Sequence, residues 1–198
     1  MTRAGKHTRK ITSDTLFGYR KNMAINYTEK GQGFWVVLEQ SGHWLKQDNV
    51  TGWSSSDDAA VQAIIDAYPI SATIAEKKLE IDNYATELRL KVTGGVSPEQ
   101  ASWPVKSAEA QKYAVTQDAA DAPLLASEAQ YRGEPIQTIV DRVIGNANGL
   151  LAYEARIAGV AGKHKDVLSA MQKDNPTAAD FRAVLDYDYK SDAEWPSL

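Results

Sequence analysis

The residues that decide the fold are IQTIVDRVIGNANGLLAYEARIAGVAGKHKDVLSAM, at positions 136–171. Positions on one side of this stretch alternate four and three residues apart, which is the heptad period of a helix with one continuous seam. The seam consists of Ile136, Val140, Val143, Ala147, Leu150, Glu154, Ile157, Ala161, His164, Leu168 and Met171. The pattern predicts a single helix that spans roughly 55 Å, because each residue adds about 1.5 Å.

Glycines recur within this predicted helix, at Gly145, Gly149, Gly159 and Gly162. Each costs a helix about 1 kcal/mol relative to alanine. The glycines therefore predict either a bend or the close approach of a neighbouring segment.

A seam of this length needs a covering partner, because an exposed apolar stripe associates with other molecules. A second helical pattern begins at Ser71, runs for about twenty residues and ends at Gly94-Gly95. We expect the two helices to pack antiparallel, in an elongated three- or four-helix bundle or in a hairpin completed by oligomerisation. Leu150 and Ile157, at the centre of the seam, are candidate packing or partner residues.

The segment between these helices contains Trp103-Pro104. The preceding Ser97-Pro98-Glu99-Gln100 is typical of a helix start with a capping box, so Pro104 is expected to bend the helix just beyond its first turn. Trp103 is interpreted as a packing anchor against the long seam, with a ligand or glycan site as the alternative. Two shorter helices, separated by TQDAADAP and closed by Gly133, are predicted for this segment.

Residues 23–70 predict a small separate domain. The run from Phe34 to Leu38 fits either a buried strand or a short helix. HWLKQ, DNVTG and WSSS then predict a β-hairpin, and SDDAAVQAIIDAYP predicts a helix with Ser56 as its N-cap. Trp35, Trp44 and Trp53 are expected to pack against that helix as a small core, the alternative being a ligand-binding aromatic patch.

The two ends of the chain differ in charge. Residues 1–22 hold six basic residues and a single acid, whereas the whole chain has a net charge of −4. This leader is a solvated tail, a docking arm for an acidic partner, or a segment that precedes a natural start at Met23. Near the C-terminus, Asn175-Pro176 predicts the start of a short helix. The aromatic-acidic tail after that helix, which includes Trp195, is either frayed or a docking peptide.

Few residues point to chemistry. The chain has no cysteine, and His7, His43 and His164 lack further ligands at metal-like spacings. Gly31-x-Gly33 lacks the third glycine of a dinucleotide-binding loop. We therefore predict no enzyme activity, no metal and no cofactor. The composition and the acidic body argue against a membrane span and against nucleic-acid binding.

Part of the chain resembles a known protein module, which indicates where the protein acts. SPEQASWPVKSAEAQKY, followed by DAPLLASEAQYRGEPIQTIVDRVIGNANGLLAYEARIAGVAGKHKDVL, resembles a helical module common in small tail proteins of tailed bacteriophages and prophages. The module combines a helix with an ASWP…EA core, an Asp-x-Pro-x-Leu turn, a helix ended by Arg-Gly and a long final helix. Residues 71–171, about half the chain, take part.

The resemblance implies a structural component of a phage tail that acts as a tail-fibre or baseplate adaptor or spacer and contacts other tail proteins. Its place would be the virion tail, reached through the host cytoplasm during assembly. The ending AEWPSL is similar to the closing residues of tail-fibre assembly chaperones, so a chaperone absent from the mature virion is the alternative. Exposed aromatic residues at the C-terminal end would serve that alternative.

The sequence thus predicts an α+β, mainly α fold. A small hairpin-plus-helix domain at residues 23–70 precedes an elongated antiparallel helical bundle at residues 71–173, which has one long heptad-patterned helix. Residues 1–22 form the basic leader or docking arm, and residues 174–198 form a short helix and the tail.

Overall fold

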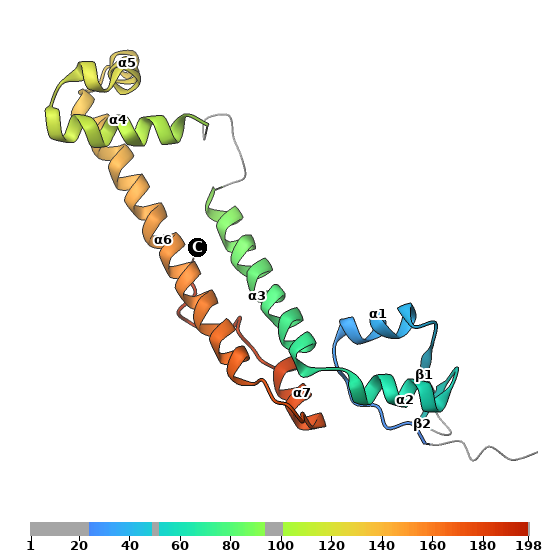
Figure 1. The fold of residues 1–198 in the computed structure, drawn as a ribbon. Helices are drawn as coiled ribbons and strands as arrows, with labels where there is room; N and C mark the ends of the chain where they lie inside the picture. Colours follow the sequence, from blue (N-terminus) through green and yellow to red (C-terminus); the bar gives the residue numbers. More distant parts are fainter. Residues whose placement is uncertain (1–23, 49–51, 94–100, 198) are drawn as a thin grey trace, which may run out of the picture. The chain divides into compact units, whose positions relative to one another are not determined.

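The computed structural model describes residues 24–48, 52–93 and 101–197, and these are mainly helical with one β-hairpin (Figure 1). The elements are α1 (Gln32–Gln40), β1 (Leu45–Asp48), β2 (Gly52–Ser55), α2 (Asp58–Ala67), α3 (Ile70–Thr93), α4 (Trp103–Thr116), the 3₁₀ helix η2 (Ala119–Asp121), α5 (Pro123–Arg132), α6 (Ile136–Ala170) and α7 (Ala178–Leu185). The predicted α+β, mainly α class is confirmed. None of the described helices is long and apolar enough to cross a membrane.

The described residues form two compact units. The first holds residues 24–28, 35–48 and 52–67, and the second holds residues 29–34, 68–93 and 101–197. The first unit thus ends at residue 67, and residues 29–34 belong with the second unit. The basic leader and the predicted Ser97–Gln100 capping box lie outside the described residues.

The first unit contains the predicted hairpin and helix. β1 and β2 pair antiparallel, with Leu45 opposite Ser55. Tyr27 contacts both Trp35 and Trp53, at ring-centroid distances of 5.4 and 4.8 Å, so two of the three tryptophans share one aromatic cluster. The expectation for Trp44 is wrong, because its side chain is 45% exposed.

Side-chain caps in the first unit differ from the predicted ones. The N-cap of α2 is Asp57 rather than Ser56, since the Asp57 carboxylate accepts hydrogen bonds from the backbone N–H groups of Ala59 and Ala60. The Ser56 hydroxyl instead contacts His43 Nδ1 and accepts from the Trp44 backbone N–H. The sequence pattern of Phe34–Leu38 fits either a strand or a short helix. In the structure this run belongs to α1.

The second unit is built on two antiparallel helices, α3 and α6, as predicted. Lys78 Nζ donates to Ser169 Oγ, Lys165 Nζ pairs with Asp82, and Arg89 pairs with Glu154. These contacts join progressively later residues of α3 to progressively earlier residues of α6, which fixes the antiparallel register. Figure 1 shows the two helices side by side, with α7 beside them.

The seam of α6 is covered most completely in its C-terminal half. Ile157, Ala161, His164 and Leu168 are buried there. Together with buried apolar residues of α3 and α7, they form a core. Those residues are Ile74, Ile81, Ala85, Leu88, Phe181 and Val184. This half of the seam is therefore closed within a single chain and requires no second copy.

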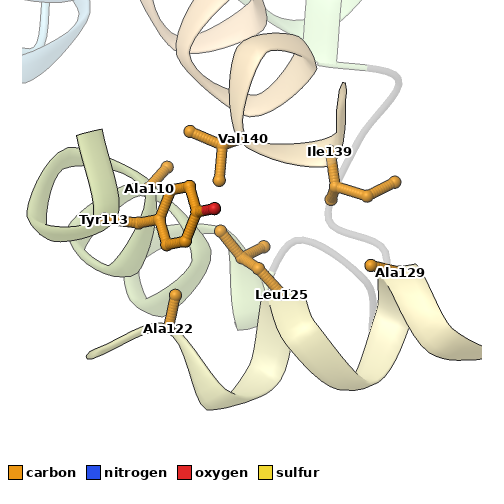
Figure 2. Close-up of a cluster of buried hydrophobic side chains, with 7 residues drawn as sticks. All are labelled: Ala110, Tyr113, Ala122, Leu125, Ala129, Ile139 and Val140. Atoms are coloured by element: carbon orange, nitrogen blue, oxygen red, sulfur yellow. The ribbon is translucent and has the colours of Figure 1, made fainter. Parts of the chain in front are cut away.

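A separate core closes the N-terminal end of α6. It consists of Ala110, Tyr113, Ala122, Leu125, Ala129, Ile139 and Val140 (Figure 2). These residues come from α4, the stretch before α5, α5 itself and the start of α6. The αL conformation of Gly133, with φ +67°, ends α5 and turns the chain into α6. One long helix thus takes part in two distinct cores.

The Trp103-Pro104 step begins a helix instead of bending one. α4 starts at Trp103, with Ser102 as its N-cap residue and proline within the first two positions. Proline is well tolerated there, because the first N–H groups of a helix have no intrahelical partner. The predicted bend at Pro104 is therefore wrong, and the step fixes where α4 starts.

Gly31-x-Gly33 spans the start of α1 and accommodates a carboxylate. Gly31 has φ +98°, which favours glycine. The Gly33 backbone N–H donates to Glu76 Oε1 at 2.8 Å, and the Tyr68 hydroxyl donates to the same oxygen at 3.1 Å. A Cβ on Gly33 would overlap the Glu76 carboxylate and lie 2.8 Å from the Tyr68 hydroxyl oxygen. The glycines therefore serve this contact.

Gly33→Ala should lower the free energy of unfolding by about 1–3 kcal/mol, because either the clash persists or the hydrogen bonds to Glu76 are lost. The same change in a Glu76→Ala background should cost much less, since most of the obstructing atoms are gone. Urea unfolding of the two single variants and the double variant measures the coupling. Equal costs in both backgrounds would show that Glu76 is not the reason for the glycine.

Candidate partner-binding site

An open groove of about 800 Å³ lies along the middle of α6, between the two cores of the second unit. Its walls come from the end of α3, the first turns of α4 and the middle of α6. The lining residues are Val92, Trp103, Pro104, Ser107, Gly145, Asn146, Ala147, Gly149, Leu150, Leu151 and Tyr153. No member of this set carries a charge, so the groove favours apolar groups. We call it the Trp103 groove.

Trp103 contributes a large apolar surface to this groove. Trp103 is 41% exposed, and Leu151, which also lines the groove, is 67% exposed. Trp103, Pro104 and Leu150 were separate candidates in the sequence, and the structure brings them together here. Trp103 thus borders open space and is only partly a packing anchor.

A smaller pocket of about 120 Å³ adjoins the groove and shares Trp103, Ser107, Asn146 and Ala147 with it. Its further lining includes Lys106, Glu128, Arg132 and Arg142. These four residues, together with Glu134, form what we call the cationic edge.

Ion pairs organise the cationic edge. Glu128 pairs with both Lys106 and Arg132, at 2.7 and 2.9 Å, while Arg142 pairs with Glu134 at 2.9 Å. The hydrogen bond from Lys106 is the main reason that the pKa of Glu128 lies below its usual value. Because Glu128 is shared, the edge has three cationic side chains and two carboxylates, and it retains an excess of positive charge.

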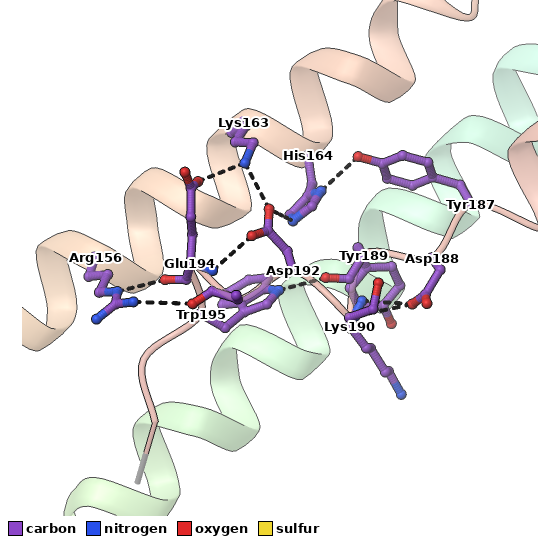
Figure 3. Close-up of polar contacts among 12 residues, drawn as sticks. Arg156, Lys163, His164, Tyr187, Asp188, Tyr189, Lys190, Asp192, Glu194 and Trp195 are labelled. Carbon is purple, nitrogen blue, oxygen red and sulfur yellow. Dashed lines mark hydrogen bonds and ion pairs between the residues drawn. The ribbon is translucent and has the colours of Figure 1, made fainter.

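The C-terminal tail is neither frayed nor available for docking. Residues 186–197 lie as a strap along α3 and α6 (Figure 3). Trp195 is 7% exposed, stacks on His164 and meets Tyr84 edge-on at 5.2 Å. Its indole N–H donates to the Tyr189 carbonyl at 2.7 Å. The exposed C-terminal aromatics expected for a chaperone are thus not found at Trp195 or Tyr189, which are buried.

Charged residues of α6 hold the strap through ion pairs and hydrogen bonds. Lys163 Nζ pairs with Asp192 and Glu194, at 2.8 and 2.6 Å. Arg156 donates to the carbonyl oxygens of Ala193 and Glu194. Figure 3 shows these contacts beside Trp195, whose ring stacks on His164.

His164 is buried beneath the strap. Its Nδ1 shares a 2.7 Å hydrogen bond with the Tyr187 hydroxyl, and its Nε2 lies 3.2 Å from an Asp192 carboxylate oxygen without making a hydrogen bond to any described residue. Glu154, another residue of the α6 seam, pairs with Arg89 and not with His164. His164 therefore serves the packing of the strap, with stacked and edge-on rings around it.

Lowering the pH should release the strap. Hydrogen bonds from Lys163 and from the Glu194 backbone hold the pKa of Asp192 below its usual value. A carboxyl group with a depressed pKa stabilises the fold fully above its unfolded pKa of about 4, and that contribution is lost as the pH falls through the folded pKa. The indole NMR signal of Trp195, followed from pH 7 downward, should therefore shift at acid pH, below the usual aspartate range.

Lys163→Met provides the control for this titration. Without the ammonium group the depression of the Asp192 pKa should shrink, so strap release should move to higher pH. Far-UV circular dichroism distinguishes strap release from global unfolding. An unchanged midpoint in Lys163→Met would contradict the role given to the Lys163–Asp192 pair.

The remaining sequence candidates lie outside the groove. Trp35 and Trp53 belong to the aromatic cluster of the first unit, whereas Trp44 is exposed with Lys46 over its ring at 5.2 Å. Ile157 is fully buried between the helices of the second unit, and Trp195 anchors the strap. These residues do not form one site.

Several groove residues were not singled out from the sequence as site residues. Leu151 and Tyr153 lie on α6 outside its seam, and Val92 lies on α3. The periodicity of the seam therefore selects none of them. Gly145 and Gly149 did carry a signal, since glycine in a helix indicates a bend or a close approach. The cationic edge is assembled from three helices and has no signature in any one segment.

Across residues 24–48, 52–93 and 101–197, no cluster of histidine and carboxylate side chains is arranged to hold a metal ion. Comparisons with protein-family models, curated proteins and solved structures gave no match.

Proposed function

We propose that this protein is a non-enzymatic structural component of a phage tail, an adaptor or spacer that binds tail-fibre or baseplate proteins. The setting rests on the resemblance of residues 71–171 to helical modules of phage tail proteins. The location that we propose is the virion tail, after assembly in the host cytoplasm.

The Trp103 groove carries the adaptor part of this proposal. Apolar surface that is contiguous and exposed favours association, because burying it removes that surface from water. Trp103 and Leu151 supply such surface at the middle of α6, where neither core covers them. A helix that is held at both ends and open between them suits the presentation of a binding surface at a fixed position.

Mass spectrometry of particles purified from the phage or lysogen that encodes this protein tests the proposal. We expect the protein at a copy number comparable to that of other minor tail proteins, and we expect it to copurify with a fibre or baseplate protein. Detection in producing cells without detection in particles would contradict a structural role and would support the assembly chaperone. Turnover of cell-wall or capsular glycan by the purified protein would contradict the non-enzymatic assignment.

A further inference from the structure

We propose that the Trp103 groove binds one amphipathic α-helix of a partner protein, with carboxylates of that helix placed at the cationic edge. This inference rests on the proposed adaptor function and names the chemistry of the partner. The apolar lining, the helical glycines and the charge at one end each constrain the occupant separately.

Among the described residues, nothing accounts for the glycines of the groove. Gly145 and Gly149 lie inside α6, and a Cβ added to either would meet no described atom within 4 Å beyond its chain neighbours and the nearby backbone of the helix itself. Neither has a positive φ, in contrast to Gly133 at the end of α5. Since glycine is the poorest helix former except proline, another residue would suit the isolated helix better. Their absent side chains leave room for the close approach of another backbone.

The occupant is a helix because the groove walls are helical. Extended peptides commonly bind by pairing with the free edge of a sheet, and the walls from α3, α4 and α6 offer no such edge. The α6 wall from Gly145 to Tyr153 covers about two helical turns. That length suits apolar anchors at positions i, i+3 or i+4, and i+7 of a bound helix.

The positive charge of the cationic edge, at one end of the groove, sets the orientation of the bound helix and the charge that this helix carries. Lys106, Arg132 and Arg142 exceed the carboxylates of the cationic edge by one, whereas the groove itself is uncharged. Carboxylates on the partner would satisfy this excess and fix its register. The uncharged groove of a second copy would bring no carboxylate of its own, which disfavours groove-on-groove pairing.

Two synthetic helical peptides of about 18 residues test the proposal, since each spans the groove with turns to spare. Both have the same leucine and alanine face; one carries three glutamates in its first turn and the other carries three lysines there. Fluorescence anisotropy with the full-length protein should show micromolar binding of the glutamate peptide, at least tenfold tighter than that of the lysine peptide. Equal binding of both peptides, or no binding of either, would overturn the proposal.

Gly149→Leu and Gly159→Leu form a matched pair of variants. Both positions are on α6 with open space above them, but only Gly149 lines the groove. Both changes should raise the melting temperature, because leucine is the better helix former. Only Gly149→Leu should weaken binding of the glutamate peptide, by at least tenfold. Equal effects of both variants on binding would show that the peptide does not occupy the groove.

Arg142→Glu tests the orientation. It should remove the preference for the glutamate peptide or reverse it, and an unchanged preference would overturn the role of the cationic edge. Light scattering tests the competing occupant: a doubled mass that Gly149→Leu abolishes would identify a second copy in the groove and overturn the partner helix.

The peptide experiment and the virion experiment test the groove inference and the structural role separately. If neither peptide binds but the protein is present in particles, only the groove inference is wrong. If the glutamate peptide binds as expected but the protein is absent from particles, only the structural role is wrong.

Discussion

Replacing Ile157 by aspartate should unfold the α3–α6–α7 part of the second unit. Ile157 is fully buried on the face of α6 that packs with α3. The change removes a buried apolar side chain and places an unpaired carboxylate in its position, which together should cost at least about 4 kcal/mol. Because this half of the seam is closed within one chain, we expect lost helicity rather than dissociation of an oligomer.

Guanidinium unfolding monitored by circular dichroism measures this loss, with Leu151→Asp as the control. Leu151 lies on the same helix but is 67% exposed, so its replacement should change stability by only about 0.5 kcal/mol. Leu150, which is half-buried in the groove wall, should give an intermediate value. Similar midpoints for Ile157→Asp and the wild type would refute the assignment of this seam as a core.

Trp195→Ala should have the second largest effect, about 3 kcal/mol. The change removes a buried ring that contacts Tyr84 and His164, together with the hydrogen bond to the Tyr189 carbonyl. The loss cannot exceed the stability that the docked strap adds, because a detached strap has no further contact to lose. We therefore expect a folded variant in which the strap is released and α3 and α6 are less stable.

Two variants calibrate that result. Trp195→Phe keeps most of the ring packing and loses the indole hydrogen bond, so it should cost about 1 kcal/mol plus a smaller packing term. Trp103→Ala removes a tryptophan of the same unit that is 41% exposed, and it should cost clearly less than Trp195→Ala. Urea unfolding compares the three. Equal losses for Trp103→Ala and Trp195→Ala would contradict the difference in burial.

Local periodicity explains which parts of the fold could be predicted. The α6 seam and the pattern of α3 are repeated over many residues, so their helices, their antiparallel pairing and the hairpin of the first unit followed from the sequence. The turn into α6 followed from Gly133, because a positive φ at a helix end favours glycine.

Helix starts were less predictable, since neighbouring polar residues compete for the same role. Asp57 caps α2 although Ser56 was expected, and Thr177 forms the capping box of α7 with Asp180 although Asn175-Pro176 was expected. The placement of the strap was also not predictable. It depends on Lys163, His164 and Tyr84, which are distant in sequence from Trp195.

The groove could be predicted only in part. Its candidates Trp103 and Leu150 were identified individually, but their proximity depends on how α4 crosses α6. Leu151 follows Leu150 directly but lies off the seam, and it is more exposed to solvent.

The sharing of α6 between two cores has a consequence for amide hydrogen exchange. Amides near Val140 and Leu168 lie in packed cores, whereas those between Gly145 and Tyr153 have less tertiary cover. Exchange from helix segments with few buried contacts requires only local opening, which costs less than opening a core. A slow–fast–slow exchange profile should therefore run along one unbroken helix, and an occupant of the Trp103 groove would make that profile uniform.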